Sequence, residues 1–275
     1  MKIIRLVAGS FGDFFRDNGL MLAGSMSYFT MMAMVPLSLF LVTLFGHFLG
    51  EYPGFYKFFL SRITNFFPSV TQEITQDLTK IISYRGIGRV SLLLYGLLSY
   101  QVFASLETAL DAIFKVRKRR HVLLSLLLSL CVVSLVIALL TVSFAAASLI
   151  SFLKVSAPEL LGFRIGGVTR LLLRYVLPFL LVMFLVVVLY VLVPQTKVQF
   201  LRALRGAFFT TIMLEVAKYA FTWYVSSVAH FGRIYGPLTA FVVFLLWMFY
   251  SWTIFLIGAE IVHNSGDRKS LRSGK

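Results

Sequence analysis

Two long apolar segments near the C-terminus constrain the fold more than any other feature of this chain. One covers residues 203–229, in which Glu215 and Lys218 are the charged residues that follow Arg205. The other covers residues 235–262. Each is long enough for a helix to cross the roughly 30 Å hydrocarbon core of a bilayer. Only residues 230–234 separate them. The short connection predicts an antiparallel pair of membrane-spanning helices.

The rest of the chain has the same character. Charged residues make up 13% of it, against roughly a quarter in soluble domains, and the mean hydropathy is +0.88. We therefore predict an all-α polytopic membrane protein with six transmembrane helices, and amphipathic interfacial helices at the N-terminus (residues 2–17) and in the first outer loop. A single transmembrane domain is predicted over residues 1–265, followed by a polar cytoplasmic tail over 266–275. The predicted spans are 20–49, 90–114, 122–153, 171–193, 203–229 and 235–262.

The basic residues predict the orientation. The N-terminus, the turns at 115–121 and 194–205 and the tail together hold 15 of the 26 Lys and Arg residues. Short loops rich in Lys and Arg stay on the cytoplasmic side, so we expect both termini in the cytoplasm. The same bases suit anionic lipid headgroups as partners, and not nucleic acid. An oligomer is left open.

Charged residues inside the spans are the first candidates for function, because each needs a partner or water in hydrocarbon. Glu215 and Lys218 are three residues apart and share a helix face. They form either a structural ion pair or a polar patch lining a path for a charged group. Glu107 is a further candidate for that path, on a face that also carries Tyr100 and Gln101.

Other residues are candidates for structure or gating. Asp111 precedes Lys115 by one helical turn, so we interpret it as an interfacial ion-pair partner. Glu260 is expected to anchor the end of the last span, against Arg202 or Arg205. Pro36 removes a backbone hydrogen bond from the first span, which predicts a kink or a hinge. Arg233, Tyr235 and Gly236 belong to the predicted turn between the last two spans, where they also suit an outer headgroup.

Motifs for enzyme chemistry are missing from the sequence. The four histidines lie at the ends of predicted spans without metal-site spacing, and the chain has one cysteine. We find no Walker loop, GxSxG or HExxH pattern. We therefore expect no metal, no cofactor and no enzymatic activity, and any transport must run without an ATPase of its own.

Three stretches resemble one family. They are LAGSMSYFTMMAMVPLSLFLV in the first span, SLETALDAIFKV at the end of the second, and the block from Val193 to Ile261 that contains the Tyr235-Gly236 turn and Gly258-Ala259-Glu260. Together they are similar to the YihY/BrkB family of bacterial inner-membrane proteins, a virulence-factor family once labelled ribonuclease BN. The resemblance implies a multi-pass protein with six helices in the bacterial inner membrane, and a role in moving or arranging lipids or envelope components. The sequence offers no phosphodiesterase site to support the nuclease label.

The leading hypothesis is a lipid or envelope-component translocator. Its polar faces on the second and fifth spans would shield a headgroup while the acyl tails stay in lipid. The alternatives are a permease or channel for a small solute or anion, and a scaffold for envelope assembly that transports nothing.

Overall fold

The computed structural model describes residues 2–33, 87–116, 120–156, 175–225 and 239–273, which are helical apart from short turns. No strand occurs in these ranges. The chain divides into two compact units. Unit 1 comprises residues 1–20, 106–216 and 253–275, and unit 2 comprises residues 21–105 and 217–252.

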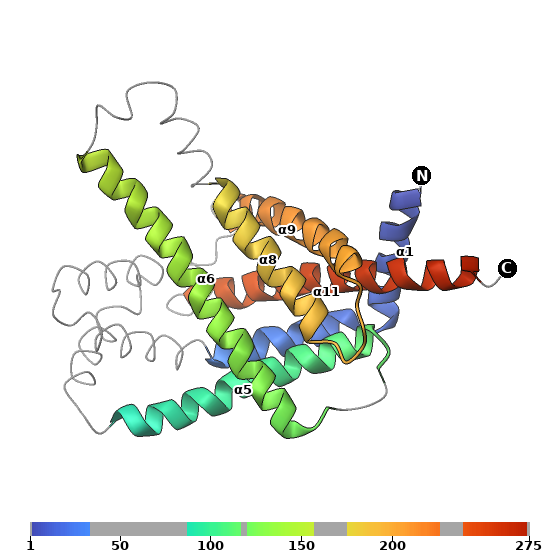
Figure 1. Cartoon of the computed structure of the whole chain (residues 1–275), viewed down its shortest axis with the longest axis horizontal. Helices are drawn as coiled ribbons and strands as arrows, with labels where there is room; N and C mark the ends of the chain where they lie inside the picture. The colour runs from blue at the N-terminus through green and yellow to red at the C-terminus, as the bar shows by residue number, and fades with distance from the viewer. Residues whose placement is uncertain (1, 34–86, 117–119, 157–174, 226–238, 274–275) are drawn as a thin grey trace. The chain divides into compact units, whose positions relative to one another are not determined.

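The helices follow the predicted spans closely, and Figure 1 labels them. An N-terminal helix, α1, covers Lys2–Arg16, where an interfacial helix was expected, and residues 19–33 form a second helix. The remaining helices are α5 (Ile87–Ile113), α6 (Val122–Ser156), α8 (Leu177–Leu192), α9 (Phe200–Trp223) and α11 (Thr239–Ser273). The rest of the predicted first span, and the outer loop after it, lie outside the described residues.

One boundary differs from the prediction. The polar tail was expected to begin at residue 266, but α11 continues through Ser273. Asn264 and Ser265 would often end a helix by bonding to their own backbone. Here Asn264 bonds to α1 instead, and the Ser265 hydroxyl donates to the carbonyl oxygen of Ile261 at 2.6 Å. Asn264 thus binds a neighbouring helix instead of the backbone of α11.

The membrane character of the described residues is clearest in one stretch. Phe241–Gly266 is 26 residues long, contains an 18-residue window with a mean hydropathy of 2.0, and is long and apolar enough to cross a bilayer. Two shorter apolar stretches are Val122–Val136 and Leu177–Leu192. The total of six spans stays a prediction.

Close contact between small residues forms the centre of unit 1. Tyr190 of α8 is fully buried, and its hydroxyl donates to the backbone oxygen of Phe255 at 2.6 Å. The Thr210 hydroxyl of α9 lies 2.9 Å from the Tyr190 hydroxyl oxygen. A side chain at Gly258 would overlap both hydroxyls, and one at Gly206 would overlap Val262 and the Gly258 carbonyl. These glycines let α9 and α11 approach closely enough to enclose the tyrosine.

Unit 2 has its own polar contacts. Trp252 donates its indole N–H to the hydroxyl of Thr30 at 3.0 Å, and that hydroxyl donates to the carbonyl oxygen of Met26 at 2.7 Å. The hydroxyls of Ser25 and Ser105 are 3.4 Å apart. These bonds join α11, α5 and the helix over residues 19–33 within this unit.

Candidate functional site

Two acidic residues at the end of α5 form the densest polar cluster in unit 1. Glu107 and Asp111 are four residues apart, so one helical turn places both carboxylates on the same face. Glu107 is only 9% exposed, and Asp111 is half-buried. Carboxylates in such positions need donors, because removing a charge from water without compensation is costly.

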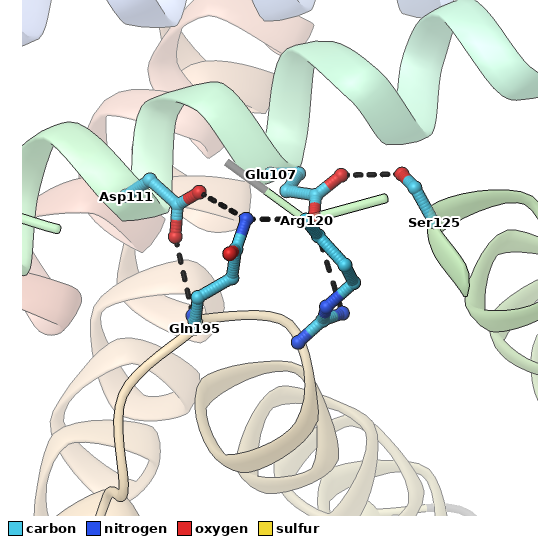
Figure 2. A network of polar contacts seen from close by, with 5 residues as sticks. All are labelled: Glu107, Asp111, Arg120, Ser125 and Gln195. Carbon is cyan, nitrogen blue, oxygen red and sulfur yellow. Dashed lines mark hydrogen bonds and ion pairs between the residues drawn. The ribbon is translucent and has the colours of Figure 1, made fainter. Parts of the chain in front are cut away.

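A single glutamine bridges the two carboxylates. The backbone N–H of Gln195 donates to Asp111 Oδ1 at 3.2 Å, and its side-chain amide donates to Asp111 Oδ2 at 3.1 Å. The same amide nitrogen lies 3.4 Å from Glu107 Oε1, as Figure 2 shows. Gln195 therefore ties the segment after α8 to the end of α5.

The second oxygen of Glu107 accepts a hydrogen bond from the Ser125 hydroxyl, in the first turn of α6. Arg120, just before α6, places Nη1 3.8 Å from Glu107 Oε1. Figure 2 shows these two residues and Gln195 converging on the α5 carboxylates. Glu107 thus has an amide, a hydroxyl and a guanidinium as partners, which is enough to compensate a buried carboxylate.

The local sequence explains how Gln195 reaches this position. Pro194 follows α8 directly, and proline is a poor continuation of a helix because it lacks a backbone donor. The helix ends at Leu192, and the N–H of Val193 still bonds to the Leu189 carbonyl at 3.1 Å. The next N–H, that of Gln195, is then free of the helix and available to Asp111.

The end of α5 is set by a Schellman turn. Lys115 has a φ of 56°, its N–H bonds to the Ala112 carbonyl at 3.2 Å, and the N–H of Val116 bonds to the Asp111 carbonyl at 2.9 Å. This pair of bonds satisfies carbonyls that a helix end leaves open. After this turn, the start of α6 places Arg120 and Ser125 beside Glu107.

The predicted pairing of Asp111 with Lys115 is wrong. Lys115 Nζ lies 3.6 Å from Oδ2 of Asp17, in the turn after α1, while Asp111 bonds to Gln195. The four-residue spacing assumes that the helix continues through residue 115. The left-handed conformation at Lys115 breaks that continuity and directs its side chain elsewhere.

Among the described residues, neither Arg202 nor Arg205 pairs with Glu260 as predicted. Glu260 is fully buried, and among the described residues neither carboxyl oxygen has a hydrogen-bond partner. Arg205 is exposed, and Arg202 approaches Gly266 instead. In the part of the chain that the structure describes, the charged groups around Glu260 are Asp17, Asp13 and Lys115.

The remaining predicted path residues are more open. On α9, Glu215 is half-buried and Lys218 is exposed, with its Nζ 5.9 Å from the centre of the Tyr219 ring. On α5, Tyr100 is half-buried and Gln101 is exposed, so they do not extend the buried surface of Glu107. Pro36, Arg233, Tyr235 and Gly236 lie outside the described residues, and their roles stay predictions.

Sequence reasoning missed three of the five residues in the cluster. Arg120 was counted only as a topology signal, and Ser125 and Gln195 were not singled out. Gln195 is 84 residues from Asp111 along the chain. The one available signal was its position after Pro194, since the proline predicts a free backbone donor there.

In the described part of the chain, no group of three or more His, Cys, Asp or Glu side chains could hold a metal ion. The donors around Glu107 and Asp111 hold these carboxylates in place rather than leave them open for proton transfer to a substrate. The arrangement therefore suits a clamp that joins α5, α6 and the segment between α8 and α9.

Comparison with known proteins supplies the context for this clamp. Residues 10–273 match the family described as virulence factor BrkB. The chain belongs to the BrkB family. Its relatives include a UPF0761 membrane protein of Aliivibrio fischeri (strain MJ11), 30% identical over 262 residues, which cover 92% of this chain and 80% of the relative.

Other BrkB relatives are similar to the same degree. A UPF0761 membrane protein of Vibrio vulnificus (strain YJ016) is 30% identical over 91% of this chain and 79% of its own length. One from Chlorobium luteolum is 31% identical over 90% of this chain, but over only 57% of its own length. No solved structure matches the chain. This BrkB protein is thus a helical membrane protein.

Proposed function

We propose that this protein moves lipids, or envelope components with lipid tails, across a bacterial inner membrane without an ATPase of its own. The observation that carries the proposal is the exposure of Lys218 on α9, where Glu215 is the one other charged residue after the basic first turns. A charge within an apolar helix is costly in hydrocarbon and usually marks a path for polar groups.

The surroundings of Lys218 suit an amphiphilic molecule. Its neighbour Tyr219 is 65% exposed, with the ring centre 5.9 Å from Nζ. Trp223, one turn beyond Tyr219 on the same side of α9, is 63% exposed. An ammonium beside exposed aromatic rings offers a counter-ion for a phosphate and apolar contact for an acyl chain. Glu215, one turn earlier and half-buried, would compensate the ammonium when no headgroup is present.

Apolar exposure elsewhere is consistent with contact to lipid tails. The first turns of α6 expose a run of large apolar side chains, which in water would be an aggregation hazard. They are Val122, Leu123, Leu124, Leu126, Leu127 and Leu130.

Reconstitution into vesicles tests the proposal. Purified protein enters liposomes of phosphatidylethanolamine and phosphatidylglycerol that contain a trace of fluorescent phospholipid, and a membrane-impermeant quencher reports movement between leaflets. We expect faster movement than in protein-free liposomes. Lys218→Met should slow it about tenfold, which corresponds to ~1.4 kcal/mol on the barrier.

Lys197→Met is the matched control, because it removes the same charge from an exposed position between α8 and α9. It should leave the rate unchanged. Wild-type rates equal to those of empty liposomes would remove the proposal. Flux of a small anion without lipid movement would favour the permease. If neither lipid nor anion moves, and Lys218→Met retains envelope function, the scaffold would be favoured.

A further inference from the structure

A second buried polar cluster in unit 1 lies where α1, the end of α5 and α11 meet, apart from the Glu107 clamp. Its centre is Glu260, which has no exposed surface and no hydrogen-bond partner for either carboxyl oxygen among the described residues. Asp17 faces it from the turn after α1. Asp17 Oδ2 is likewise buried without a hydrogen-bond donor, although Lys115 Nζ lies 3.6 Å away.

Within the described ranges, the charges around Glu260 do not balance if every acid is ionised. Asp13 and Asp17 contribute two carboxylates and Lys115 contributes one ammonium. Arg202 is directed to Gly266, and the half-buried His263 packs edge-on against Phe114 with ring centres 5.7 Å apart. An ionised Glu260 would be a third carboxylate beside one ammonium, without a hydrogen-bond donor among the described residues.

A proton resolves both problems at once. Two carboxylates that face each other are both acceptors, so neither can bond to the other unless one carries a proton. A proton on one of them converts the repulsion into a short hydrogen bond and removes one buried charge. The remaining negative charge on Asp17 then faces Lys115.

We infer that Glu260 and Asp17 form a proton-binding site. Glu260 carries the proton, and its O–H donates a hydrogen bond to the Asp17 carboxylate. No metal is needed, and no group suited to a metal occurs among the described residues. The site joins α11 to the N-terminal segment and is separate from the path proposed for lipids. The site would bind its proton whether or not the protein moves lipid.

The neighbouring contacts show what the proton stabilises. Asn264, one turn after Glu260, donates to Asp13 Oδ2 at 2.9 Å and lies 3.1 Å from the Ser10 hydroxyl. These bonds dock α1 on the end of α11. Loss of the proton would place like charges on both sides of this contact, so the N-terminal helix should detach as the pH rises.

Infrared spectroscopy of the purified full chain in nanodiscs tests the site directly, because a protonated carboxyl has a C=O stretch that an ionised one lacks. We expect one such band at neutral pH that disappears in Glu260→Gln. The matched control Glu107→Gln replaces a buried glutamate that has its own donors, and should keep the band. A wild-type spectrum without the band, or a band that Glu260→Gln retains, would overturn the inference.

Glutamine preserves the shape of Glu260 and can donate to Asp17, so this variant should fold. If it does not, Asp17→Asn supplies the same test: the band should persist and shift, because the O–H loses its ionic acceptor. An unchanged band in Asp17→Asn would contradict the pairing. Thermal unfolding in sodium, potassium and choline chloride at equal ionic strength distinguishes the ligand, since stabilisation by sodium or potassium alone would indicate a bound cation instead of a proton.

Discussion

The Tyr190 hydroxyl donates a 2.6 Å hydrogen bond to the backbone oxygen of Phe255, and so links α8 to α11 inside unit 1. The same hydroxyl meets Thr210 of α9 at 2.9 Å. Because Tyr190 already donates to Phe255, the Thr210 hydroxyl is the donor in the second bond. Three helices thus share one buried phenol oxygen.

Tyr190→Phe should therefore destabilise the protein. The substitution keeps the ring and leaves the buried Thr210 hydroxyl without its acceptor, which typically costs about 1–3 kcal/mol. Unfolding in mixed detergent micelles measures the difference. Tyr28→Phe, at a residue that is 55% exposed, is the control and should change little. Equal stability of Tyr190→Phe and the wild type would show that the bond contributes nothing net.

Gly258→Ala should be destabilising, because the new Cβ would overlap the hydroxyls of Tyr190 and Thr210. Forcing a methyl group into a packed contact typically costs about 1–3 kcal/mol. Gly24→Ala is the contrasting control: it lies in a helix with open space around it and should be neutral or stabilising by up to ~1 kcal/mol. Thermal unfolding and the yield of monodisperse protein give both values, and the same sign for the two variants would contradict this packing.

Gln195 and Asp111 should be energetically coupled. Gln195→Ala removes the side-chain amide from both carboxylates, and Asp111→Ala removes its main acceptor. A double-mutant cycle on unfolding free energies should give a coupling of about 0.5–3 kcal/mol. Lys197→Ala combined with Asp111→Ala is the control cycle and should be additive. A coupling near zero for the first pair would mean that the contact does not stabilise the clamp.

Two substitutions of Lys115 should change the stability of the protein in opposite directions. Lys115→Met keeps the unfavourable left-handed backbone and loses the partly exposed ion pair with Asp17, worth about 0–1 kcal/mol. Lys115→Gly also loses the pair but relieves about 1–2 kcal/mol of backbone strain. We expect the glycine variant to be the more stable of the two in thermal unfolding. Both variants lack the ion pair, so the reverse order would contradict a cost of the left-handed backbone at residue 115.

Much of the helical pattern could be predicted from the sequence. The limits of α5, α6 and α8 follow from apolar length, from the basic cluster after Phe114 and from Pro194, which are local signals. The end of α11 could not be predicted this way. Its polar last turns read as a tail, and they remain helical because Asn264 finds partners on α1, far away in the sequence.

For the candidate sites too, part could be predicted from the sequence and part could not. The sequence identified Glu107, Asp111 and Glu260 as charges that need compensation, since that cost depends on residue type and on the apolar surroundings. It could not assign their partners, and it paired Asp111 and Glu260 wrongly. A left-handed residue at position 115 redirects one side chain, and helix packing brings Gln195 and Asp17 to acids far away in the chain.

By itself, the sequence determined that this chain forms apolar helices of a membrane protein, and which of its charges are buried at a cost. Only the tertiary structure decided that Glu107 is compensated by three donors, while Glu260 has no hydrogen-bond donor among the residues that the structure describes. The physical reason is that a buried charge is compensated by the orientation of donors around it. That orientation depends on how the helices end and pack, and not on the residues next to the charge in the sequence.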